Sequence, residues 1–130
     1  MKTINNIRSF QEHSIWWDED LGIARAKAVG AIDEASANFI LLETARIAQH
    51  YGGKIDWLIN LSEMTQATSK ARKILAEASA HPSIRKYALS GASVFIRTVA
   101  NFISVAAGQK NALHFSTDEQ ALDWLQEDVV

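Results

Sequence analysis

The segment at residues 55–61, with the sequence IDWLINL, constrains the fold most strongly. It is an almost continuous apolar run, interrupted by Asp56 and Asn60. A strand that is apolar at nearly every position has both of its faces covered, as in sheets that pack helices on both sides. The sequence therefore predicts an interior strand at residues 55–61 in a mostly parallel sheet.

Amphipathic helices and further strands alternate around this segment. Asp33 is the predicted N-cap of a helix that runs to Tyr51, where two glycines stop it. A buried stripe, Ala71-Ile74-Leu75-Ala78, predicts a second helix over residues 68–80. Thr117, with Gln120 three residues later, forms a capping box that opens a last helix. The other predicted elements are strands at 14–17, 23–29 (ended by Gly30), 87–90 and 112–115, and a helix at 92–107.

The resulting element order is β-β-α-β-α-β-α-β-α. An opening antiparallel hairpin followed by alternating helices and strands is typical of a mixed, mostly parallel sheet with right-handed crossovers. We therefore predict an α/β fold of about five strands and about four helices. The chain has one proline and no low-complexity linker, so residues 1–130 are expected to form a single domain.

Composition and motifs argue against several classes of protein. The chain has no cysteine and a net charge of −2, which excludes disulfides and thiolate metal sites and disfavours a nucleic-acid partner. Glycine-rich phosphate loops and helical histidine pairs do not occur, so no cofactor or metal is expected. The N-terminus lacks the apolar region of a signal peptide, and the stretch 91–108 is too short and polar to span a bilayer. These features predict a cytoplasmic protein without a transmembrane segment.

The element order, over nearly the whole chain, resembles the STAS domain superfamily, with the SpoIIAA-like fold of bacterial anti-sigma factor antagonists. The local likeness centres on Leu58-Ile59-Asn60-Leu61-Ser62, followed seven residues later by Ser69. In those antagonists the strand ends in Asp-Leu-Ser, and a serine at the next helix start is phosphorylated by the partner kinase. The resemblance implies that Ser69 takes the phosphoserine position and Thr68 that of the preceding aspartate. The kinase-recognition motif itself is altered, because Thr68 is not acidic, Asn60 replaces an aspartate and Lys70-Ala71 replace Ser-Gly.

The C-terminal half is similar to a bacterial branch described as STAS/SEC14-like. The matching segments are Ser69-Lys70-Ala71-Arg72, Gly91-Ala92-Ser93, FIRT at residues 95–98 and FSTDEQALDWL at residues 115–125. The resemblance implies a non-enzymatic regulatory or protein-interaction module. The SEC14-like label implies an alternative, a carrier of a small apolar or acidic ligand in a cleft beside the second and third predicted helices.

The start of the helix at 68–80 carries three cations, Lys70, Arg72 and Lys73, where the helix dipole favours negative charge. One interpretation is an ordinary solvated helix start, with the carboxylates of Glu63 and Glu77 nearby. The other is a site for an anion, either a phosphate on the serine of this turn or a bound acidic group. The candidate anion or phosphorylation site consists of Ser69, Thr68, Arg72 and Lys73.

Two further features are weighed against structural explanations. Gly91-Ala92-Ser93 has the position of a nucleophile elbow, but Phe95 replaces its second glycine, so a hydrolase that uses Ser93 is less favoured than a helix cap. No catalytic residue is therefore predicted. Phe39 and Leu42 fall on the polar half of their helix and form a candidate partner surface. This apolar excess favours a homodimer, the commonest oligomer.

Overall fold

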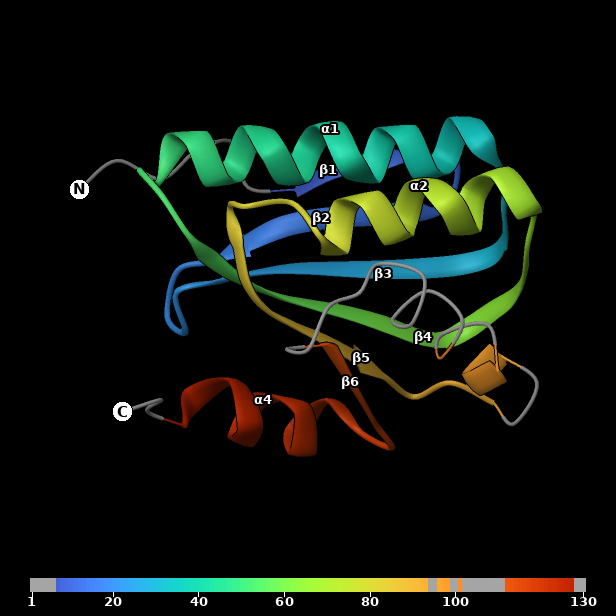
Figure 1. Cartoon of the computed structure of the whole chain (residues 1–130). Helices are drawn as coiled ribbons and strands as arrows, with labels where there is room; N and C mark the ends of the chain where they lie inside the picture. Colours follow the sequence, from blue (N-terminus) through green and yellow to red (C-terminus); the bar gives the residue numbers. More distant parts are fainter. Residues whose placement is uncertain (1–6, 94–95, 99–100, 102–111, 128–130) are drawn as a thin grey trace.

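The computed structural model describes residues 7–93, 96–98, 101 and 112–127, which form one six-stranded sheet with helices on both faces (Figure 1). The strands are β1 (Ile7–Phe10), β2 (His13–Asp18), β3 (Ile23–Ile32), β4 (Ile55–Ala67), β5 (Ile84–Ser90) and β6 (Ala112–Phe115). The helices whose bounds lie in the described ranges are α1 (Glu34–His50), α2 (Ser69–Ser79) and α4 (Asp118–Gln126).

The sheet has the order β1-β2-β3-β4-β5-β6. The pairs β1–β2 and β2–β3 are antiparallel, and the pairs β3–β4, β4–β5 and β5–β6 are parallel. The predicted mixed, mostly parallel sheet with an opening hairpin is confirmed. It contains one strand more than the five that were predicted.

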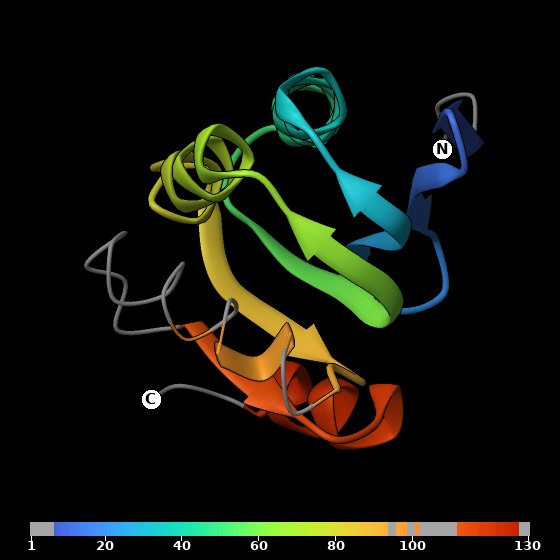
Figure 2. The same ribbon diagram turned by 90° about the vertical axis from the view of Figure 1, so that its right-hand side faces the viewer.

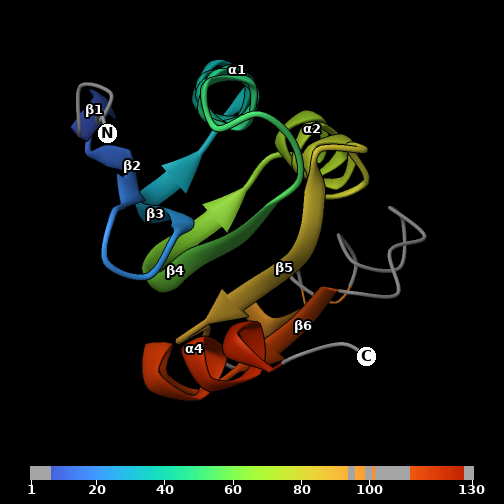
Figure 3. The same cartoon turned by 90° about the vertical axis from the view of Figure 1, so that its left-hand side faces the viewer.

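Two hydrophobic layers lie on opposite faces of this sheet. Helices α1 and α2 cover one face, and α4 lies against the other (Figures 2 and 3). The larger core lies under α1 and α2, where Ile40, Ile47 and Leu75 pack against β-strand residues. The smaller core lies under α4 and consists of Ile23, Leu58, Ala88, Ala121 and Leu125.

Strand β4 is the interior strand that the apolar run predicts. It lies between β3 and β5, and its residues Trp57, Leu58 and Ile59 are at most 1% exposed. The strand continues beyond Leu61 to Ala67, because its second half pairs with the end of β3. Covering by helices on both faces explains why this segment is apolar at consecutive positions.

Replacing Ile59 with alanine is expected to lower the free energy of unfolding by about 2–5 kcal/mol. The side chain is 1% exposed, so its removal leaves a cavity that the surrounding core fills only in part. Chemical denaturation of the wild type and the variant measures the difference. A loss below about 0.5 kcal/mol, the usual effect of a surface substitution, would contradict the burial of this residue.

The starts of α1, α2 and α4 are those that the sequence predicts. Each N-cap side chain accepts a hydrogen bond from a backbone N–H three residues later, which satisfies a donor that the helix leaves unpaired. The cap bonds join Asp33 to Ser36 (2.9 Å), Thr68 to Ala71 (3.0 Å) and Thr117 to Gln120 (3.2 Å). The side chain of Gln120 accepts from the Ser116 N–H at 3.1 Å. In the predicted capping box it would accept from the N–H of the next residue, Thr117.

Several other predictions about strands and helices were wrong or incomplete. Gly30 does not end β3: with a φ of 74° it accommodates a register shift, and the strand continues to Ile32. Strand β1 was not predicted, because three of its four residues are exposed and show no apolar alternation. The predicted helix at 92–107 is described at residues 96–98 and 101, which are helical, and its remaining part lies mostly outside the described residues. The cleft expected beside that helix therefore lies largely outside them too.

Candidate functional site

Ser69 is the first residue of α2, and its side chain is exposed. The Arg72 guanidinium, one turn further on, donates from Nη2 to Ser69 Oγ at 3.1 Å. The first intrahelical bond of α2 runs from the Arg72 N–H to the Thr68 carbonyl at 2.9 Å, and the Thr68 side chain occupies the Ala71 N–H. The backbone N–H groups of Ser69 and Lys70 precede these bonds, as at any helix N-terminus.

Other charges lie near this helix start. Lys73 is exposed, and Lys70 Nζ lies 3.9 Å from Glu34 Oε1 in the first turn of α1. Glu63 forms an ion pair with Lys27 of β3. Thr68, Ser69, Arg72 and Lys73 therefore lie together at one exposed helix start, and their role as an anion or phosphorylation site stays a prediction.

The two residues of the candidate partner surface differ in their surroundings. Leu42 is 67% exposed on α1. Phe39 is half-buried, because its ring stacks on that of Phe10 in β1 with ring centroids 5.6 Å apart. Strand β1 thus covers part of the surface that the sequence left open for a partner, and Leu42 is the more accessible of the two.

Ser93 has the geometry of a helix cap. Its Oγ accepts a hydrogen bond from the Ile96 N–H at 3.2 Å, and its carbonyl accepts from the Arg97 N–H at 2.7 Å. The neighbouring His114 accepts from the Ala92 N–H through Nε2 at 3.3 Å. Burial, aided by the charge of Arg97, lowers the pKa of His114. Among the described residues, no histidine forms a hydrogen bond with Ser93 Oγ.

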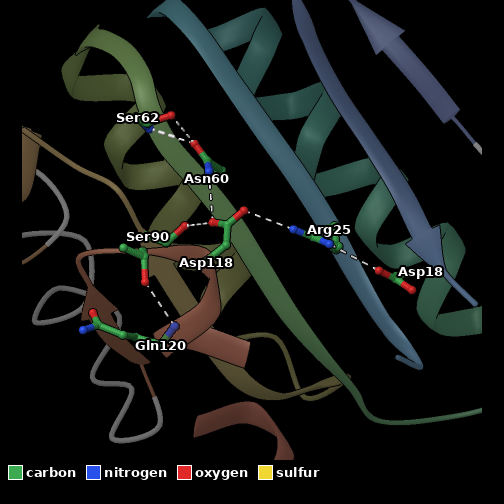
Figure 4. Close-up of polar contacts among 8 residues, drawn as sticks. Asp18, Arg25, Asn60, Ser62, Ser90, Asp118 and Gln120 are labelled. Carbon is green, nitrogen blue, oxygen red and sulfur yellow. Dashed lines mark hydrogen bonds and ion pairs between the residues drawn. The ribbon is translucent and has the colours of Figure 1, made fainter. Parts of the chain in front are cut away.

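A second polar site lies around the carboxylate of Asp118, which contacts the middle of β4 and the carboxyl end of β5 (Figure 4). Asp118 is the first residue of α4. Its Oδ1 accepts from Asn60 Nδ2 at 2.9 Å and from the Ser90 hydroxyl, and its Oδ2 accepts from Arg25 Nη2 at 3.1 Å. We call the three donors, Arg25, Asn60 and Ser90, the carboxylate receptor; they come from three adjacent strands.

Next to this receptor, Gly91 follows the last residue of β5 and closely approaches β4. Its φ of 74° lies in the left-handed region, and a Cβ built on it would lie 3.0 Å from Ser62 Cβ. Its N–H donates to the Phe115 carbonyl at 3.0 Å. Glycine is the residue that combines this backbone angle with so short an approach, so it lets the ends of β5 and β6 lie against the middle of β4.

The sequence did not single out the carboxylate receptor. Its members are separated by up to 93 residues from Asp118, and no local motif connects them. The available signal was positional: Asn60 is a polar residue near the end of the apolar run at residues 55–61, and Ser90 is the polar last residue of β5.

Comparison with known proteins identifies the fold. The family model described as SpoIIAA-like matches residues 23–126. A solved structure of an uncharacterized protein from the DUF3478 family, with a SpoIIAA-like fold, from Shewanella loihica PV-4 is 16% identical, with a TM-score of 0.61 over 96% of this chain and 98% of that chain. The anti-sigma factor antagonist SpoIIAA in its unphosphorylated form is 13% identical, with a TM-score of 0.57 over 95% and 98%. No match was found among curated proteins.

Two further observations concern the described helices and the extent of the region that the family model matches. None of the helices in the described ranges has the length and apolar character needed to cross a membrane. The matched region begins with β3 and ends with α4, so it contains both the start of α2 and the carboxylate receptor. The chain belongs to the SpoIIAA-like family.

Proposed function

We propose that this chain is a non-enzymatic regulatory module that binds a protein partner at the start of α2, and that phosphorylation of Ser69 switches this binding. The observation that supports the proposal most directly is the hydrogen bond from Arg72 to the exposed Ser69 hydroxyl. Membership of the SpoIIAA-like family and the fold shared with an anti-sigma factor antagonist support the class of function.

The local geometry suits a phosphate on Ser69. A phosphoryl group carries about −1.5 to −2 charges at neutral pH and accepts strong hydrogen bonds. Arg72 already lies within hydrogen-bond distance of the oxygen that would carry the group, and the N-terminus of a helix favours negative charge. The phosphate would stabilise the first turn of α2 while it offsets much of the positive charge of Lys70, Arg72 and Lys73. A partner that recognises the unmodified surface would then bind poorly.

The first test is the native mass spectrum of the protein isolated from its own cells. The wild type is expected to carry one phosphate, and Ser69→Ala is expected to carry none. Ser116→Ala, which removes another exposed serine hydroxyl, is the matched control and should keep the phosphate. A phosphate that persists in Ser69→Ala, or its absence from the wild type under every growth condition, would contradict the proposal.

The second test compares partners retained by the wild type, Ser69→Ala, Ser69→Asp and Arg72→Ala on an affinity support. Ser69→Asp is expected to retain at least about tenfold less partner than the wild type. Its carboxylate places a negative charge where the partner would otherwise meet a neutral serine. Ser69→Ala should retain it. Equal retention of the same partner by all four chains would show that the start of α2 is an ordinary solvated helix end.

A further inference from the structure

Helix α4 is attached to the sheet by polar groups at both of its ends. At its start, Asp118 occupies the carboxylate receptor. At its end, the ammonium of Lys86, a residue that is 4% exposed, donates to the carbonyls of Trp124 at 2.8 Å and Glu127 at 3.2 Å. Between these ends, Ala121 and Leu125 complete the smaller core. The sheet face under α4 is thus an apolar strip with one cation at each end.

The carboxylate receptor is positioned by the sheet itself. The Arg25 guanidinium also binds Asp18, with Nη1 3.3 Å from Oδ2, and lies 5.7 Å from the ring centroid of Trp16. Asn60 Oδ1 accepts from both the N–H (2.9 Å) and the hydroxyl (2.6 Å) of Ser62, which turns its amide nitrogen toward Asp118 (Figure 4). These contacts do not involve α4, so the receptor keeps its geometry when α4 leaves.

A vacated receptor would present three donors that already point to one place. Ser90 is fully buried while α4 is in place and Arg25 and Asn60 are half-buried, so an occupant that brings a carboxylate regains hydrogen bonds to donors that the sheet has positioned. The surface under α4 therefore selects an occupant that brings a carboxylate to Arg25, apolar side chains to the strip and helix carbonyls to Lys86. This combination describes an amphipathic helix with an acidic residue in its first turn.

We propose that the sheet face under α4 is an exchangeable docking surface, and that its second occupant is the α4 helix of another copy of this chain. The complementarity on the page is that of α4 itself: Asp118 matches Arg25, and the helix C-terminus matches Lys86. Two residues, Ser116 and Thr117, join α4 to β6. Exchange of such a terminal element between identical chains is a low-cost route to a dimer. This surface lies on the sheet face opposite α2, so the proposal does not depend on Ser69.

Two variant chains with complementary defects test the exchange. Asp118→Ala has an intact receptor and a defective helix start, whereas Arg25→Ala has an intact helix and a defective receptor. Mixed at high micromolar concentration, they are expected to form the heterodimer in at least about tenfold excess over either homodimer, because one of its two surfaces regains a hydrogen-bonded charge pair. Native mass spectrometry separates the three species by mass.

The control replaces Asp118→Ala with Asp123→Ala, which removes an exposed carboxylate of the same helix. This mixture should show the statistical ratio of dimers. A statistical ratio in the test mixture as well, or monomers alone, would overturn the proposal. If either variant loses the exchange protection of β3 and β4, the same measurement with Asp118→Asn and Arg25→Lys applies, and a statistical ratio there has the same meaning.

A labelled peptide with the sequence of residues 116–127 gives a second readout. It is expected to bind the Asp118→Ala chain at least about tenfold more tightly than the wild type, in which the surface is occupied by the chain's own helix. The same peptide with Asp118→Ala should bind at least about tenfold more weakly. Equal binding of both peptides would show an unspecific apolar surface and would overturn the role of the receptor.

Discussion

Replacing Trp57 with alanine is expected to lower the free energy of unfolding by about 3–5 kcal/mol. Trp57 is fully buried in β4, and its ring contacts that of Tyr87 in β5 edge to face, with centroids 4.6 Å apart. The substitution removes the largest fully buried side chain of the described residues and leaves a cavity between sheet and helices. Urea denaturation followed by circular dichroism measures the change in the free energy of unfolding.

The matched control for this change is Trp57→Phe. Among the residues that the structure describes, the indole N–H of Trp57 has no hydrogen-bond partner, so phenylalanine removes volume but breaks no polar bond. Its cost should be clearly smaller than that of alanine. A cost for Trp57→Phe equal to that of Trp57→Ala would contradict the expectation that the cost depends on the buried volume removed.

The free energy of unfolding is also expected to fall as the pH drops from about 7 to 5. Burial lowers the pKa values of His13 and His114, which lie in β2 and β6. Below about pH 6.5, the unfolded chain binds a proton at each histidine that the folded chain does not bind. Stability is therefore complete above this range, is lost as the pH falls through it, and levels off below the folded-state pKa values. The slope for each histidine is at most about 1.4 kcal/mol per pH unit.

Two substitutions separate these histidines from other titrating groups. His13 Nδ1 accepts from the Val29 N–H at 3.1 Å, a position that the oxygen of His13→Asn can take. His114 accepts through Nε2, which the oxygen of His114→Gln can replace. The double variant should have a flatter stability profile than the wild type between pH 7 and 5. An unchanged slope in the double variant would assign the acid sensitivity to other groups.

The pattern of apolar and polar residues predicted most of the fold, because apolar positions indicate which side chains face the core. The apolar run of β4 and the stripe of α2 each correspond to residues that are buried between sheet and helix. The sequence of β1 has no such apolar pattern. It is an edge strand attached through main-chain pairing with β2 and through the stacking of Phe10 on Phe39. The predicted strand end at Gly30 was wrong because a glycine with a positive φ occurs in β-bulges as well as at strand ends.

The two candidate sites differ in how far the sequence could predict them. Ser69 and Arg72 are three residues apart on one helix, so their contact follows from helical spacing alone. Asp118 contacts Arg25, Asn60 and Ser90 because their strands are neighbours in the sheet, and local sequence patterns do not encode this pairing. The second site can therefore be predicted only when the pairing and register of the strands are known.

The spatial order of the strands, which equals their order along the chain, has a consequence for synthesis on the ribosome. Each strand that emerges can add to the free edge of the strands made before it, and none has to insert between two that are already paired. The antiparallel strands come first and are joined by short turns, which close on the microsecond timescale. The parallel strands follow, each after its crossover. The sheet can thus be assembled in the direction of translation, which proceeds at about 5–20 residues per second.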